Sequence, residues 1–247
     1  MHHVHANADC HAVRPRALAS IDGQWINIAD EADAIRAVRR DLRQGLGFTL
    51  HALTLEHLAI RRSDPAYRDA YLGATYVTCD TGPVAALARR QHRLVRPTSA
   101  RDLIEPLCRL AATERLPVYL FGSHGEAVRR AAGQLIQRTP GLDICGSQSP
   151  PATFDPSSAG ADAAIDRMAA SGARLCLISI DSPRQELLSR RALDRHPHLG
   201  LVNIGNGIDA IAGERARAPV MALRARRGLL LAEVAIAHPI RRHLGLA

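Results

Sequence analysis

Apolar and polar residues alternate in blocks along the chain from about Ala17 onward. Short apolar runs rich in β-branched residues predict strands, and longer stretches with an apolar residue every three or four positions predict helices. Strands that alternate with helices build a parallel sheet covered by helices on both faces. The pattern therefore predicts an α/β fold with a Rossmann-like parallel sheet, followed by a C-terminal helical appendage.

The individual elements follow from the same pattern. One predicted strand ends at Leu50, and the others span 74–78, 117–121, 142–145, 174–180 and 199–204. The predicted helices span 53–62, 84–90, 126–138 and 161–170, and a further helix begins near Arg101 or Asp102. That start places Pro106 in a first turn, where a helix tolerates proline. Residues 182–185 predict a capping box with Pro183 at the first helical position, and 147–160 predict a long loop.

The segments that follow the predicted strands are the first place to look for a site. Ligands of parallel sheets bind beyond the carboxyl ends of the strands, so we expect these segments to share one edge. They contain Thr49 and His51, Asp80, and residues 122–125, 181–185 and 205–209.

Asp80 directly follows the predicted strand 74–78 and Cys79. A carboxylate at the ligand edge of the sheet can accept a proton from an attacking hydroxyl group, which makes Asp80 a candidate general base. An aspartate before a helix is also a common N-cap, and position alone does not separate the two roles.

Three other segments each allow a binding role and a plain structural role. Residues 122–125 join a strand to a helix, where backbone amides could bind a phosphate group or simply form a tight turn. The start of the helix near Ser182 offers a second anion site, although a capping box needs no ligand. Asp209, after the turn 205–207, could bind a hydroxyl group or cap the next helix.

Composition narrows the classes of partner. The 247 residues carry a net charge of +8, and every basic side chain other than histidine is arginine, which favours phosphorylated or otherwise anionic partners. Basic charge without interleaved aromatic residues argues weakly against single-stranded nucleic acid. The five cysteines are scattered and odd in number, so neither a zinc site nor a disulfide framework is expected, and a reducing cytoplasm is the simple interpretation.

The two ends of the chain differ from its centre. Residues 1–16 are rich in histidine and lack the apolar segment of a signal peptide, so we expect a disordered leader. Residues 17–213 form the predicted α/β catalytic domain, and residues 214–247 form an arginine-rich helical appendage. That appendage could meet anionic lipid, or it could dock on the core with its arginines in solvent. No apolar run reaches the roughly 20 residues that span a bilayer.

Taken in order, these segments resemble the WecG/TagA/CpsF glycosyltransferases, glycosyltransferase family 26, from about residue 21 to residue 242. The early matches are residues 21–30, 48–51, 64–65, 79–84 and 98–103. The later matches are residues 121–125, 153–156, 182–186, 205–213, 217–219 and 238–242. The Ser-Pro-Arg-Gln-Glu segment 182–186 is the most specific of them. Departures from the family pattern include His51 for asparagine, Thr81 for glycine, Asp181 for a small residue, and the tail positions 230, 231 and 234.

The resemblance implies an inverting transfer of a hexose or N-acetylhexosamine, of the hexosyl- or N-acetylmannosaminyltransferase type. The donor would be a UDP-sugar, and the acceptor a polyprenyl-diphosphate-linked saccharide of a bacterial cell-surface polysaccharide pathway. Asp80 stands where the family has its proposed base. The implied substrate-binding residues are Thr49, His51, Gly122, Ser123, Ser182, Arg184, Gln185, Glu186, Asp209 and Arg217.

The resemblance also sets expectations about partners and place. It implies no cofactor and no divalent metal, because tail arginines such as Arg217 could stabilise the leaving diphosphate instead. It implies a cytoplasmic protein that associates peripherally with the anionic inner face of the cell membrane through its C-terminal arginines. Nucleic acid is not an expected partner, and the sequence leaves a homo-oligomer open.

Two alternatives to an active transferase remain at this point. A non-catalytic relative of the same fold would bind nucleotide or lipid and transfer nothing, with equal binding by wild type and Asp80→Asn. A basic nucleic-acid-binding protein would show strongly salt-dependent binding that does not need Asp80. The aspartate and the segment 182–186 favour the transferase.

Overall fold

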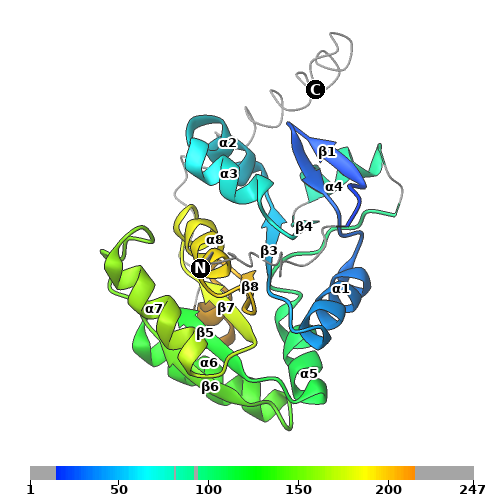
Figure 1. Cartoon of the computed structure of the whole chain (residues 1–247). Helices are drawn as coiled ribbons and strands as arrows, with labels where there is room; N and C mark the ends of the chain where they lie inside the picture. The colour runs from blue at the N-terminus through cyan, green and yellow to red at the C-terminus, as the bar shows by residue number, and fades with distance from the viewer. Residues whose placement is uncertain (1–14, 81, 92–93, 215–247) are drawn as a thin grey trace, which may run out of the picture.

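The computed structural model describes residues 15–80, 82–91 and 94–214. Its centre is a parallel sheet of six strands in the order β4-β3-β8-β7-β5-β6, with helices on both sides (Figure 1). This confirms the predicted α/β, Rossmann-like fold. The strands of the sheet are β3 (Phe48–Leu53), β4 (Tyr76–Cys79), β5 (Val118–Gly122), β6 (Ile144–Gln148), β7 (Leu175–Ser179) and β8 (Gly200–Asn203).

A small antiparallel hairpin precedes the sheet and was not predicted. Its first strand packs against α4 and its second against β4. The hairpin strands are β1 (Ala19–Ile21) and β2 (Gln24–Ile26). The helices are α1 (Glu31–Arg43), α2 (Leu55–Ser63), α3 (Pro65–Leu72), α4 (Gly82–Arg89), α5 (Ile104–Glu114), α6 (Gly125–Arg138), α7 (Ala159–Ala170), α8 (Arg184–Arg195) and α9 (Gly207–Ile211).

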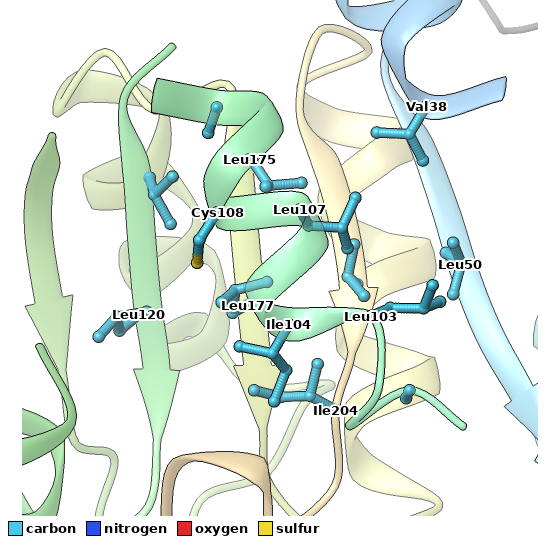
Figure 2. Packing of buried hydrophobic residues seen from close by; sticks show 14 of the residues in the cluster. Val38, Leu50, Leu103, Ile104, Leu107, Cys108, Leu120, Leu175, Leu177 and Ile204 are labelled. Atoms are coloured by element: carbon cyan, nitrogen blue, oxygen red, sulfur yellow. The ribbon is translucent and has the colours of Figure 1, made fainter. Parts of the chain in front are cut away.

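Each central strand buries side chains on both of its faces, as strands of a covered parallel sheet must. On one face, Leu120 and Leu177 pack among residues of α1, α5 and α6, and Figure 2 shows Leu107 and Cys108 of α5 above them. On the other face, Phe121 and neighbouring residues of β7 pack against α7 and α8. The near-continuous apolar runs of these strands are the direct result of this double burial.

The first strand of the sheet extends further than predicted. Thr49 and His51 interrupt its apolar pattern, yet all residues from Phe48 to Leu53 are buried and pair with β4 as far as Leu53 opposite Cys79. The expectation that Thr49 and His51 follow the strand is therefore wrong, because both lie within it. Thr54 is the residue that follows the strand.

The capping box predicted at residues 182–185 is also wrong. Helix α8 begins at Arg184, its N-cap position is Pro183, and no side chain caps it. The Ser182 hydroxyl group instead donates a hydrogen bond to the Glu186 carboxylate at 2.8 Å, and its oxygen accepts from the Gln185 side-chain amide at 3.1 Å. By contrast, α5 begins at Ile104 and keeps Pro106 in its first turn, as predicted.

The order of the strands places a topological switch point between β5 and β7. These two strands are neighbours, but the chain leaves β5 toward β6 at one edge and leaves β7 toward β8 in the opposite direction. Ligands of open α/β sheets bind at the carboxyl ends of such strand pairs. Most of the predicted leader 1–16 and of the predicted appendage 214–247 lies outside the described residues, namely residues 1–14 and 215–247 with Arg217.

Candidate functional site

Asp80 lies at the carboxyl edge of the sheet, as predicted. It directly follows β4, and its backbone N–H donates to the Leu53 carbonyl at the end of β3, at 3.0 Å. Thr54, next along the chain from Leu53, accepts a hydrogen bond from the His57 backbone at 3.1 Å and caps α2. Asp80 and Thr54 therefore follow two adjacent strands at one place on this edge.

Thr54 is a candidate site residue that the sequence analysis missed. A threonine before an apolar helical pattern is a typical N-cap, and this signal would have placed the end of the strand correctly. The polar residues Thr49 and His51 were mistaken for that end. In the structure Thr49 bonds reciprocally with Thr75, each hydroxyl oxygen accepting from the other residue's backbone N–H at 3.1 and 3.2 Å.

His51 is buried inside the sheet and neutral. Burial lowers its pKa to about 3, and its Nδ1 atom accepts a hydrogen bond from the Asn203 side chain at 2.9 Å. Asn203 in turn accepts from the Ser189 hydroxyl group at 2.6 Å. The His51 contacts join β3, β8 and α8, and the Thr49 contacts join β3 to Thr75. Both side chains therefore stabilise the sheet. A substrate-binding role for either residue stays a prediction.

The close contact between the ends of β5 and β7 requires glycine at position 122. Gly122 has φ of +130°, and a Cβ atom there would lie 1.9 Å from the carbonyl oxygen of Ser179. The next residue, Ser123, also has positive φ, and its backbone N–H donates to the same carbonyl at 3.0 Å. The predicted turn 122–125 is therefore held directly against the end of β7.

Two predicted site residues meet beside the ends of β5 and β7. The Ser123 hydroxyl group donates to the Asp209 carboxylate, which joins the segment after β5 to helix α9 after β8. Ser179 also binds this region, because its hydroxyl oxygen accepts from the Ile208 backbone at 3.2 Å. Gly122, Ser123 and Asp209 thus gather at one place, next to the start of α6, which no side chain caps.

The segment 182–186, which follows β7, is partly exposed at its start and buried at its end. Gln185 is 4% exposed and Glu186 1% exposed. The Gln185 amide donates to the Ser182 hydroxyl oxygen at 3.1 Å and to Glu186 at 2.9 Å, while its carbonyl oxygen accepts from the Gly205 backbone at 3.1 Å. Ser182, Gln185 and Glu186 are therefore brought together, and Gln185 connects the segment after β7 with the turn after β8.

Arg184 and Asp181 stand on the outer side of the same segment. The Arg184 guanidinium group donates to the Ala152 carbonyl at 3.1 Å and lies 3.5 Å from the Asp181 carboxylate. This arginine is therefore close enough to pair with the negative charge of Asp181. It also ties the segment after β6 to the start of α8.

Glu186 should make the stability of the protein depend on pH. Burial raises its pKa to about 7 from a usual value of 4.5, and hydrogen bonds from Ser182 and Gln185 offset part of the rise. Because the folded state then holds the proton more tightly than the unfolded chain, stability falls as pH rises from about 4.5 to 7. At pH 8 we expect Glu186→Gln to be more stable than wild type by up to about 3 kcal/mol in the free energy of unfolding, and so to unfold at a higher temperature. Near pH 4.5 this difference in stability should disappear.

Thermal unfolding of both proteins across this pH range measures the effect. Asp194→Asn, an exposed acidic residue on the same helix, is the matched control and should leave the pH dependence unchanged. A constant stability difference between wild type and Glu186→Gln at every pH would show that Glu186 does not titrate in this way.

The part of the chain that the structure describes shows neither a metal-type cluster nor a membrane-spanning helix. Among residues 15–80, 82–91 and 94–214, no three His, Cys, Asp or Glu side chains are grouped so that they could hold a metal ion. The metal-free reaction stays a prediction. Within the same residues, no helix combines the length and the apolar character needed to cross a bilayer.

A comparison with protein families agrees with these features. The model of the glycosyl transferase WecG/TagA/CpsF family matches residues 19–230, which include the whole described sheet, Asp80, and the segments after β5, β7 and β8. The match covers most of the 247 residues. The chain therefore belongs to the WecG/TagA/CpsF family of glycosyltransferases.

Proposed function

We propose that the protein is an inverting glycosyltransferase that moves a hexose or N-acetylhexosamine from a UDP-sugar to a polyprenyl-diphosphate-linked saccharide. The position of Asp80 carries this proposal. In a chain of this family, a carboxylate directly follows an outer strand and is tied through its backbone to the end of the adjacent strand. A base for the acceptor is needed at such an edge, within reach of a sugar bound beyond the strands.

The proposed reaction is a single displacement. Asp80 accepts the proton of the acceptor hydroxyl group while that oxygen attacks the anomeric carbon of the donor. The bond between the anomeric carbon and the diphosphate oxygen breaks, and UDP leaves with the electron pair. One displacement inverts the anomeric centre, so a single carboxylate base suffices and no covalent sugar–enzyme intermediate forms.

The carboxyl ends of β5 and β7 are the proposed place of the donor. The uncapped start of α6 and the Asp209 carboxylate offer hydrogen-bond partners for polar groups of the donor. C-terminal arginines, with Arg217 the best matched, would stabilise the charge on the departing diphosphate. The same arginines would hold the protein at the anionic inner face of the membrane, where a polyprenyl acceptor resides.

A panel of donors tests this function. The full chain is incubated with UDP-glucose, UDP-N-acetylglucosamine or UDP-N-acetylmannosamine and a short-chain polyprenyl-diphosphate-linked saccharide, and released UDP and extended acceptor are measured. We expect release of UDP that depends on the acceptor with one class of donor. Binding of a UDP-sugar without any transfer would instead identify a non-catalytic relative, and failure to bind any donor would contradict both.

A further inference from the structure

Glu186 has surroundings that a substrate-contacting residue would not need. The side chain is 1% exposed, one of its oxygens accepts two hydrogen bonds, and the other has no partner within the described residues. It lies where α8 packs against α3. Burying a carboxyl group in this way is energetically unfavourable unless its hydrogen bonds stabilise the structure.

The bonds of Glu186 connect segments that follow three different strands. Its Oε1 atom accepts from the Ser182 hydroxyl group at 2.8 Å and from the Gln185 amide at 2.9 Å. The Ser182 oxygen also lies 3.3 Å from the Nε2 atom of His57. His57 belongs to α2, the helix after β3 that Thr54 caps. Through Gln185 it reaches Gly205, in the turn after β8.

The same connections end beside the candidate site. Leu53, at the end of β3 and next to Thr54, accepts the hydrogen bond from the Asp80 backbone. Gly205 belongs to the turn between β8 and α9, the helix that contains Asp209. Loss of the acceptor at position 186 would leave the Ser182 hydroxyl group and the Gln185 amide without a shared partner. The segments after β3, β7 and β8 would then be free to shift relative to one another.

We propose that Glu186 is a positioning residue, whose buried carboxyl group holds the segments after β3, β7 and β8 together as one unit beneath the donor site. It acts through Ser182 and Gln185 and does not touch the sugar nucleotide. This inference rests on the proposed function for its effect on transfer, and on the hydrogen bonds alone for its effect on the protein.

The charge state of Glu186 matters for this role. The titratable groups that face it are Tyr67 and Tyr71 of α3, and, beyond Ser182, His57 of α2. Burial keeps His57 neutral by lowering its pKa to about 4. Arg61 of α2 is directed to the Asp22 carbonyl, at 3.4 Å. An ionised Glu186 is therefore unpaired, and the unit is best held when Glu186 carries its proton.

Glutamine reproduces the protonated form of Glu186, because its carbonyl oxygen accepts both bonds and its amide replaces the protonated oxygen. We expect Glu186→Ala to lower kcat/KM at least tenfold, mainly through a higher KM for the donor. We expect Glu186→Gln to restore it to within about twofold of wild type below neutral pH, and to remove the decline of wild type above pH 7. Asp194→Asn, on the same helix, should behave as wild type.

A readout without substrate separates this inference from the proposed function. The Gly205 backbone N–H, which donates to Gln185, should exchange with solvent at least tenfold faster in Glu186→Ala than in Glu186→Gln or wild type. Unchanged exchange in Glu186→Ala would overturn the inference, whatever the enzyme transfers. Equal loss of kcat/KM in Glu186→Gln and Glu186→Ala would overturn it as well, because only direct contact of the carboxylate with substrate would explain that result.

If wild type transfers no sugar, the proposed function fails and the exchange result still decides this inference. If Glu186→Ala does not fold, slower exchange of Gly205 in Glu186→Gln than in wild type at pH 8 is the supporting result, and equal exchange is the contradicting one.

Discussion

Replacing Asp80 with asparagine should abolish transfer while UDP-sugar binding remains measurable. The two side chains have nearly the same shape, but an amide cannot accept the proton of the acceptor hydroxyl group. General-base catalysis contributes about 10²- to 10⁴-fold to a rate, so a loss of this size in kcat is expected. The backbone bond from Asp80 to Leu53 does not involve the side chain and survives the substitution.

The measurement is the initial rate of acceptor-dependent UDP release, together with donor affinity by calorimetry. Asp69→Asn is the control, since Asp69 is an exposed aspartate on α3 that was not predicted as a site residue. It should keep the rate of wild type. Turnover of Asp80→Asn within a few fold of wild type would remove Asp80 as the base.

Among single glycine-to-alanine substitutions at the site, Gly122→Ala should cause the largest loss of stability. Its Cβ atom would lie 1.9 Å from the backbone oxygen of Ser179, and neither β5 nor β7 can move away without breaking the pairing between them. A φ of +130° adds strain for any residue with a Cβ atom. Overpacking and strain together predict a cost of about 3 to 5 kcal/mol.

Gly125→Ala is the matched control for this change. Gly125 begins α6 three residues further on, and a Cβ atom there meets nothing within 4 Å. Because alanine favours a helix more than glycine does, stability should stay the same or rise by up to about 1 kcal/mol. Denaturant unfolding compares the two variants, and equal midpoints would contradict the close approach of Gly122 to Ser179.

The fold was largely predictable, because double burial of parallel strands leaves apolar runs that are visible in the sequence. The edge positions of Asp80 and of the turn 122–125 followed from the same pattern. The end of β3 did not, since Thr49 and His51 look like loop residues. Their partners, Thr75 and Asn203, are distant in the chain, and only pairing in space satisfies them within a buried strand.

The segment 182–186 shows a second limit of sequence patterns. Ser182 and Gln185 have the spacing of a capping box, yet their side chains bond each other and Glu186 in place of the helix amides. What decided this was the burial of Glu186 against α3, a contact that no local pattern reports. Tertiary packing thus overrode a local capping preference.

The most direct test of the central claim is the anomeric configuration of the product, determined by NMR on acceptor extended by the wild-type enzyme. A single displacement with Asp80 as base predicts that the linkage formed has the opposite configuration to the sugar in the UDP donor. A product that retains the donor's configuration would contradict the proposed mechanism.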